Sequence, residues 1–205
     1  MNCPKTVRTI TEARNSVRII GGTWRGRRVG FPDLEGLRPT PDRVRETLYN
    51  WLQQAVAGTR CLDLFAGSGA LGLEALSRGA HSVVFVEQAQ AAARFLTREL
   101  ERFKALPRAR VVEMGASRFL RSSAATFGAP FDLVFLDPPF GRAALAEFVP
   151  LLEAGGWLKS GSLVYLENEK SAGAPALPPN WALLKSKSAG EVGYHLARVS
   201  ERAEQ

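Results

Sequence analysis

From residue 61 onward, short apolar runs alternate with longer segments in which apolar side chains recur every three or four positions. The short runs are typical of strands that are buried on both faces, and the longer segments are typical of amphipathic helices. This alternation predicts an α/β fold, a doubly wound, Rossmann-like parallel sheet with helices on both faces. The expected strands lie near residues 61–65, 83–86, 110–113, 132–136 and 162–166, and the expected helices near 70–78, 89–104, 117–122 and 142–153.

Both ends of the chain depart from this alternation. Residues 1–16 are expected to form a flexible tail, and residues 17–30 a small hairpin, followed by a loop. Near the other end, residues 181–187 and 192–199 predict an antiparallel hairpin. The expected organisation is therefore a tail at 1–16, a hairpin extension with its loop at 17–36, and one α/β domain at 37–205.

A helix is expected to begin at Thr40 and Pro41, ahead of the first strand of this domain. Threonine is a good N-cap, and proline suits the first position of a helix. Val44, Leu48 and Leu52 follow at intervals of four residues and form one apolar stripe. The sequence therefore predicts an amphipathic helix that packs on the α/β domain.

A glycine-rich turn follows the first expected strand. Gly67, Gly69 and Gly72 have the G-x-G-x-x-G spacing, which permits a tight turn and lets a ligand approach backbone N–H groups at a helix start. The next apolar run, Val83–Val86, ends at Glu87, where a carboxylate can accept hydrogen bonds from both ribose hydroxyls. On their own, these features fit a nicotinamide dinucleotide as well as S-adenosylmethionine.

The strand near 132–136 runs directly into Asp137-Pro138-Pro139-Phe140. Proline fixes its own backbone and restricts the residue before it, so this corner is rigid. Asp137 and the carbonyl of Pro138 could accept the two hydrogens of an amine while the ring of Phe140 stacks on the attached base. An ordinary turn at a strand end is the competing interpretation.

The glycine turn and the proline corner together favour an amino-methyltransferase over an oxidoreductase. A dehydrogenase needs a side chain that donates or accepts a proton at the hydride site. The chain has only two histidines, and we expect His81 in a turn and His195 in a strand, rather than in catalysis. A methyltransferase needs one nucleoside pocket and an amine-binding corner beside it, and both are present.

The composition of the chain argues against a membrane protein, a secreted protein and a metal-binding or disulfide-rich protein. The chain has 205 residues, of which 45% are hydrophobic, which is enough for one buried core. No apolar run reaches the roughly 18–20 residues of a membrane span, and no signal peptide is evident. Two cysteines and no histidine cluster indicate neither a metal site nor a disulfide scaffold. We expect a cytoplasmic protein without a metal.

Positive charge is concentrated at the N-terminal side. Residues 1–60 hold 11 Lys and Arg against 5 Asp and Glu, whereas residues 61–205 hold 16 against 15. A basic hairpin is typical of a surface that binds RNA phosphates. We expect its arginines to contact RNA, and Trp24 either to stack on a base or to anchor the hairpin by packing. These arginines are Arg18, Arg25, Arg27 and Arg28.

Five segments carry a resemblance to a known family: the opening segment 17–27, the RPTPDRVRETLYNWL block at 38–52, DLFAGSGALG at 63–72, DPPF at 137–140 and AGEVGY at 189–194. Together they closely resemble the RsmD family of bacterial 16S rRNA guanine-N2 methyltransferases. The likeness covers nearly the whole chain. FAGSG and DPPF recur in other methyltransferases, so the 38–52 block is the most selective of these segments.

The resemblance implies a class I methyltransferase fold in which the helix near residue 40 covers the cofactor. It implies S-adenosyl-L-methionine as cofactor and direct methyl transfer to N2 of an extruded guanine, number 966 in conventional 16S numbering. The expected partner is 16S rRNA within the small ribosomal subunit or its assembly intermediate, and the expected state is a monomer. Another amino-methyltransferase, acting on adenine N6, cytosine N4 or protein glutamine, and a non-catalytic RNA-binding protein remain as alternatives.

The expected site residues fall into three groups. The catalytic group is Asp137, Pro138 and Phe140; the cofactor group is Thr40, Asp63, Phe65, Ala66, Gly67, Ser68, Gly69, Glu87, Gln88, Ala116 and Asp137; and the RNA group is Arg18, Trp24, Arg25, Arg27, Arg28, Arg38 and Arg43. One stretch departs from the usual pattern. Many such enzymes hold adenine with an acidic or amide side chain after the third strand, but this chain has Met-Gly-Ala-Ser at 114–117. Adenine contacts are therefore expected from the backbone near Ala116.

Overall fold

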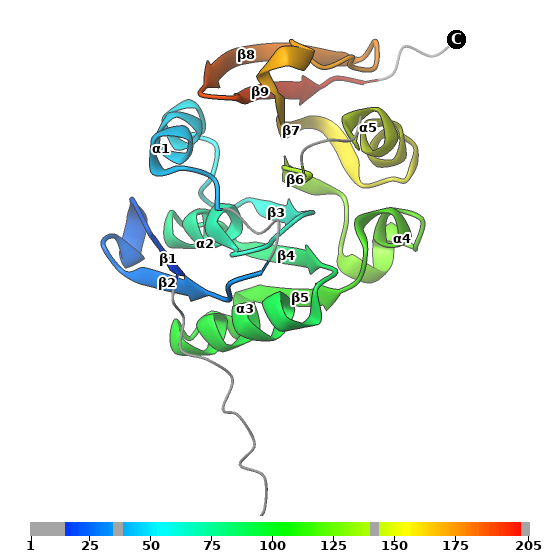
Figure 1. Ribbon diagram of the computed structural model, residues 1–205. Coiled ribbons are helices and arrows are strands. Elements are labelled where there is room, and N and C mark those ends of the chain that lie inside the picture. The colour runs from blue at the N-terminus through cyan, green and yellow to red at the C-terminus, as the bar shows by residue number, and fades with distance from the viewer. Residues whose placement is uncertain (1–14, 35–38, 140–143, 202–205) are drawn as a thin grey trace, which may run out of the picture.

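A computed structural model describes residues 15–34, 39–139 and 144–201. Two of the expected site residues, Arg38 and Phe140, lie outside the described residues, as does most of the expected tail. The described residues form a seven-stranded sheet with helices on both faces and a separate two-stranded hairpin (Figure 1). The predicted α/β fold is confirmed.

The large sheet has the strand order β5-β4-β3-β6-β7-β9-β8. The first five strands in this order are parallel, and the hairpin β8–β9 adds antiparallel strands beside β7. These strands are β3 (Arg60–Asp63), β4 (Ser82–Glu87), β5 (Ala109–Glu113), β6 (Phe131–Leu136), β7 (Leu158–Glu169), β8 (Trp181–Ala189) and β9 (Val192–Val199). β7 is longer than the expected 162–166 because it pairs with β6 at Leu158 and with β9 as far as Glu169.

Two apolar clusters lie on opposite faces of the sheet, since neighbouring residues of a strand alternate between the faces. In β3, for example, Cys61 belongs to one cluster and Leu62 to the other. Helices α1 (Asp42–Trp51), α2 (Ala70–Ser77) and α3 (Gln90–Arg102) cover the first cluster, and α4 (Ala116–Leu120) and α5 (Ala144–Ala154) cover the second. Within the described residues, no helix has both the length and the apolar composition that a membrane crossing requires.

The order of the strands reverses between β3 and β6. From β3 the chain proceeds outward to β4 and β5, and then returns to the other side of β3 to form β6. Loops that follow the carboxyl ends of β3 and β6 therefore diverge to opposite sides and leave a crevice between them, which is where open α/β sheets bind ligands. The glycine turn follows β3, and Asp137 follows β6.

The basic hairpin consists of β1 (Asn15–Arg18) and β2 (Arg28–Phe31). Its strands begin slightly earlier than the expected residue 17. Its apolar side chains, including Val17 and Val29, join the same cluster as α1, α2 and α3, so the hairpin is part of the main core. The carboxylate of Glu74 in α2 accepts hydrogen bonds from the backbone of Ile20 at 2.8 Å and of Gly21 at 2.7 Å.

The expected start of α1 needs a correction. The helix begins at Asp42, and Pro41 occupies the N-cap position with an extended backbone (φ −56°, ψ 147°). Thr40 is one residue too early to cap the helix, and its hydroxyl donates instead to Asp137 Oδ2 at 3.1 Å. The side chain expected to cap a helix thus contacts the proline corner.

Candidate active site

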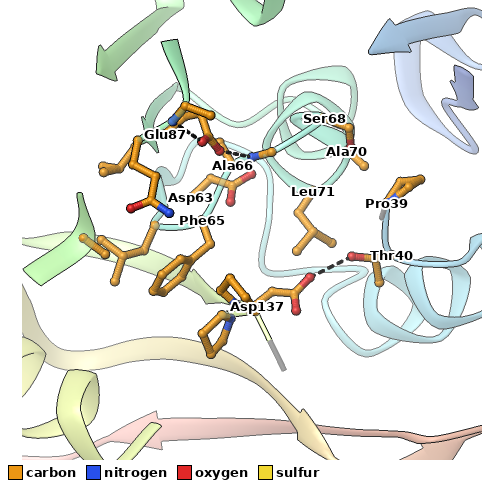
Figure 2. A pocket seen from close by; sticks show the side chains of 18 of the residues that line it. Pro39, Thr40, Asp63, Phe65, Ala66, Ser68, Ala70, Leu71, Glu87 and Asp137 are labelled. Atoms are coloured by element: carbon orange, nitrogen blue, oxygen red, sulfur yellow. Dashed lines mark hydrogen bonds between the residues drawn. The ribbon is translucent and has the colours of Figure 1, made fainter. Parts of the chain in front are cut away.

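A cavity of about 400 Å³ opens at the carboxyl ends of β3, β4 and β6. Figure 2 shows its lining, in which Asp63 lies between Glu87 and Asp137. Eleven of the expected cofactor and catalytic residues line it: Thr40, Asp63, Phe65, Ala66, Gly67, Ser68, Glu87, Gln88, Ala116, Asp137 and Pro138. Residues more than 90 positions apart in the sequence, such as Thr40 and Asp137, meet there.

Gly69 does not line the cavity, although it was expected to contact the cofactor. It precedes α2 with a left-handed backbone (φ 74°), and a Cβ atom there would lie 2.5 Å from Leu96 Cδ1. The absence of a side chain lets the turn close tightly against α3. Gly69 therefore shapes the turn that presents Gly67 and Ser68 to the cavity.

Glu87 occupies the tip of β4 and is held from two sides. Its Oε2 accepts a hydrogen bond from the backbone of Gly67 at 2.8 Å, and its Oε1 accepts one from the backbone of Ala89 at 2.7 Å. Each carboxylate oxygen can accept a further hydrogen bond. Glu87 is thus a fixed acceptor that can receive two hydroxyl donors of a ligand in the cavity.

Asp63 is a buried carboxyl group at the end of β3, with 2% of its surface exposed. Burial, the hydrogen bond from the backbone of Gly72 at 3.0 Å and the negative charges of Asp137 and Glu87 together bring the pKa of Asp63 up to about 7; burial is the largest cause, and the hydrogen bond alone opposes the rise. Among the described residues it forms no ion pair. Such a group is suited to a cationic ligand, because a buried carboxylate is stable only when it is paired.

Asp137 directly follows β6 and lies beside Thr40. Burial raises the pKa of Asp137 to about 6, and the hydrogen bond from the Thr40 hydroxyl opposes that rise. Pro138 and Pro139 continue the cavity wall. The carboxylate and the rigid backbone after it therefore face the same space as Asp63 and Glu87.

Two residues of β7 that the sequence did not reveal, Tyr165 and Glu167, lie next to this corner. Both are buried, and the Tyr165 hydroxyl donates to Glu167 Oε1 at 2.7 Å. Glu167 was missed because the apolar run ends at Leu166, and the strand continues only through its pairing with β9. One signal was present: like Asp137, Glu167 is an acidic residue that directly follows an apolar strand segment.

The two histidines lie in the kinds of segment predicted for them. His81 is exposed in the turn before β4. His195 is buried in β9, where its Nδ1 lies 2.9 Å from Ser186 Oγ and its Nε2 lies 3.2 Å from Asn168 Oδ1. Neither lines the cavity.

Of the expected RNA-binding residues that the structure describes, Trp24 is buried and the arginines are exposed. Trp24 is 8% exposed, and its ring lies 4.7 Å from that of Phe103, so it is a packing anchor and its ring is not free to stack on a base. A second cavity of about 330 Å³ lies between the hairpin and the start of α1, and it shares Pro39 and Thr40 with the first. The expected arginines that the structure describes are all exposed: Arg18, Arg25, Arg27, Arg28 and Arg43.

Comparisons with known proteins agree with this geometry. Residues 17–198 match a family model described as Conserved hypothetical protein 95. The chain is 49% identical over 188 residues to the Escherichia coli K12 protein named Ribosomal RNA small subunit methyltransferase D, which is 92% of each chain. The Haemophilus influenzae protein of the same name is 45% identical over 187 residues, covering 90% of this chain and 94% of that protein. The chain belongs to the RsmD family.

Solved structures support the same assignment of the fold. The yhhF structure from Escherichia coli has a TM-score of 0.83 and 45% identity, and the match covers 92% of this chain and all of that one. The HI0767 structure from Haemophilus influenzae has a TM-score of 0.76 and 42% identity, with 91% of this chain and all of that one covered. This RsmD-family chain therefore has the methyltransferase fold.

Proposed function

We propose that this protein methylates the exocyclic N2 of a guanine in 16S rRNA, number 966 in conventional numbering, with S-adenosyl-L-methionine as methyl donor. One observation carries the proposal: the corner at Asp137 and Pro138 opens into the same cavity as Asp63 and Glu87. A site for an amine and a site for a charged nucleoside are thus within reach of each other. The names of the relatives support rRNA of the small subunit as substrate.

The cavity suits the methyl donor in size and charge. Its volume of about 400 Å³ lies within the range of small-molecule sites, roughly 300–1,000 Å³. Glu87 can accept both ribose hydroxyls, and the unpaired carboxylate of Asp63 can pair with the ammonium group of the amino-acid part. Phe65, Met114 and Ala116 offer apolar contacts for the adenine. When bound, S-adenosylmethionine supplies an electrophilic methyl group on a sulfonium.

The proline corner orients the amine that receives this methyl group. The amine of guanine is a weak nucleophile because its lone pair is delocalised into the ring. Hydrogen bonds from its two N–H groups to Asp137 and to the Pro138 carbonyl favour a pyramidal nitrogen whose lone pair points into the cavity. Positioning of this kind can supply much of the rate increase, about 7–11 kcal/mol in favourable cases.

The proposed methyl transfer is balanced in bonds, charge and protons. The amine nitrogen bonds to the methyl carbon as the carbon–sulfur bond breaks, and the electron pair of that bond stays on sulfur. The nitrogen becomes positively charged and loses one proton. Asp137 can receive that proton as an anion at neutral pH, since its pKa is about 6, and can then pass it to solvent.

The exposed arginines of the hairpin and of α1 hold the RNA around the extruded base. Removing a base from its stack costs about a few kcal/mol, and arginine–phosphate contacts can offset that cost. Phe140, which lies outside the described residues, is proposed to stack on the guanine. The protein is proposed to act as a monomer, and its ribosomal substrate makes the cytoplasm the place of action.

The decisive experiment is incubation with labelled S-adenosylmethionine and either naked 16S rRNA or small subunits that lack the modification. Nucleoside analysis should give N2-methylguanosine. N6-methyladenosine or N4-methylcytidine would assign the corner to another base, and labelled protein would assign it to a glutamine. Cofactor binding without methyl transfer to either substrate would favour a non-catalytic role in RNA binding.

The same assay tests the role of Asp137. Asp137 was expected to serve both the amine and the cofactor, and the proposed scheme assigns its carboxylate to the amine. Asp137→Ala should therefore abolish transfer while affinity for S-adenosylhomocysteine stays within about threefold. Asp137→Asn keeps one acceptor oxygen and separates orientation from charge. Residual turnover in the Asn variant means that orientation dominates, and loss equal to that of Ala means that the negative charge is required. Wild-type turnover in Asp137→Ala would make the corner purely structural.

A further inference from the structure

Thr40 is a buried residue at the boundary between the two cavities, and it lines both of them. Its hydroxyl donates to Asp137 Oδ2 at 3.1 Å. A threonine hydroxyl has one hydrogen, so this hydrogen bond commits it to Asp137. Thr40 precedes α1 and Asp137 follows β6, so both residues lie outside the regular elements. Other contacts must therefore hold this donor in place.

The backbone of Thr40 is fixed by its neighbour in the sequence and by a buried guanidinium. Pro41 follows it, and a proline restricts the residue before it to extended conformations. The fully buried side chain of Arg45 donates from Nε to the Thr40 carbonyl at 3.1 Å. The same guanidinium donates to the Arg18 carbonyl at 2.8 Å, and its Nη1 lies 3.5 Å from Glu74 Oε2. Arg45 thus fixes the Thr40 backbone against the hairpin and α2.

The hydrogen bond from Thr40 leaves one oxygen of Asp137 for a ligand. Among the described residues, Thr40 is the one donor to this carboxylate, and it occupies Oδ2. The last torsion of an aspartate side chain is otherwise broad, so a donor on one oxygen also restricts the direction of the other. Oδ1 therefore remains as a fixed acceptor, next in the chain to the Pro138 carbonyl.

We propose that Thr40 is a positioning residue for methyl transfer, whose hydroxyl fixes the Asp137 carboxylate so that Oδ1 accepts a hydrogen bond from the target amine. The inference rests on the proposed function, because it specifies how that site orders its amine acceptor. It moves Thr40 from the cofactor group, where the sequence placed it, to the residues that act on the amine. Thr40 acts through Asp137 and exchanges no proton in the reaction.

Valine and serine at position 40 separate these two roles. Thr40→Val keeps the shape of the side chain but removes the donor, so kcat should fall by at least about tenfold while the affinity for S-adenosylhomocysteine stays within about threefold. Thr40→Ser keeps the hydroxyl, so its kcat should stay within about threefold of the wild type. Thr47→Val is the matched control, because the Thr47 hydroxyl donates to the Arg43 carbonyl within α1 and lines neither cavity.

The pH dependence of kcat is a readout that a purely structural role would not move. Burial raises the pKa of Asp137 to about 6, and the hydrogen bond from Thr40 opposes that rise. Asp137 accepts from the amine as an anion, so turnover is lost as the pH falls through this pKa. Without the hydrogen bond the pKa is higher. The acidic limb should therefore move up by at least roughly half a pH unit in Thr40→Val and stay in place in Thr40→Ser and Thr47→Val.

The other ionisable groups near Asp137 are the same in all three variants. Among the described residues they are Asp63, Glu87, Tyr165 and Glu167. No lysine, arginine or histidine of the described residues lines the cavity. A difference between Thr40→Val and Thr40→Ser therefore reports the lost hydrogen bond, provided that kcat is measured below the melting temperature of each variant.

Three results would overturn the inference. Wild-type kcat in Thr40→Val would show that the hydroxyl is not needed. Weaker binding of S-adenosylhomocysteine with an unchanged kcat at saturating donor would return Thr40 to the cofactor. A lower kcat with an unmoved acidic limb would show that valine disturbs the site without acting through Asp137. Failure of the proposed function is a separate result, because it would appear as a wild-type protein that makes no N2-methylguanosine.

Discussion

At the residue scale, the site is defined by acidic side chains in a basic protein. The chain carries a formal net charge of +7, yet Asp63, Glu87 and Asp137 line one cavity and Glu167 lies beside it. Two of the lining carboxyls have raised pKa values because burial disfavours their charged forms. Groups of this kind are characteristic of functional sites, and they make the cavity selective for ligands that carry positive charge.

Asp63 should make cofactor binding depend on pH. In the free protein its pKa is about 7, and a bound ammonium group would lower that pKa, so binding should release a proton. Affinity for S-adenosylhomocysteine should therefore rise about fivefold from pH 6 to pH 7 and level off above the pKa of the free protein. Calorimetry in two buffers of different ionisation enthalpy measures both the affinity and the proton count.

Asp63→Asn is the control for this linkage, because it removes the titrating group while Asp137 remains. The variant should bind more weakly at pH 8 and should lose the part of the pH dependence that Asp63 provides. If wild type and Asp63→Asn show the same proton release, the ammonium group is held elsewhere and the assignment of Asp63 is wrong.

At the element scale, local sequence patterns predicted the strands, helices and turns well. They could not predict which residues far apart in the sequence contact each other. The glycine turn, the carboxylates at the strand ends and the order of strands and helices are local patterns, and they placed Asp63, Glu87 and Asp137 in one cavity. Thr40 was expected to cap α1 because nothing in the local sequence reveals Asp137, which is 97 residues away. Glu167 required the pairing of β7 with β9, which is also non-local.

Arg45 is a further residue whose role the local sequence does not reveal, because its carboxylate partner, Glu74, lies on another helix. It is fully buried in α1, with Nη1 at 3.5 Å from Glu74 Oε2, and it donates to Asp42 Oδ1 at 2.6 Å and to the Arg18 carbonyl at 2.8 Å. Its Nε donates to the Thr40 carbonyl at 3.1 Å. Arg45 thus joins α1, α2 and the basic hairpin next to the cavity.

Arg45→Met should destabilise the protein by about 3–5 kcal/mol, because it leaves a buried carboxylate and two carbonyl groups without this partner. Arg78, which also contacts Glu74 at 2.7 Å, favours the lower end of that range. Denaturant unfolding measures the change, and hydrogen exchange at Ile20 and Gly21 reports on the hairpin. Arg43→Met on an exposed position of the same helix is the control and should change stability by about 0.5 kcal/mol or less. Equal stability of the two variants would mean that the hairpin is anchored without Arg45.

At the scale of the whole molecule, the basic surface and the cavity lie at the same side of the sheet. The hairpin packs on α2 and α3 (Figure 1). The segment that leads into α1 lines the second cavity together with the hairpin, and its Thr40 hydroxyl donates to Asp137. The second cavity, with Arg18 and Arg28 in its lining, reaches Thr40 at the rim of the first. Under the proposed function, an RNA strand that contacts these arginines lies beside the opening that leads to the proline corner.

Replacing Arg25, Arg28 and Arg43 together by Gln should weaken binding to the small subunit and reduce its dependence on salt. Each lost phosphate contact should lower the slope of log K against log salt by about 0.7–0.9. Affinity for S-adenosylhomocysteine should not change, since none of these side chains lines the first cavity. Arg27 is left in place because its guanidinium lies 4.0 Å from the centre of the Phe103 ring, so its loss would also disturb the hairpin.

The matched control for the hairpin variant replaces Lys185, Lys187 and Arg198 by Gln. These residues are exposed on β8 and β9, at the other end of the sheet. If the control triple variant flattens the salt dependence and the hairpin variant does not, the RNA lies across β8 and β9 and the hairpin serves only to stabilise the fold.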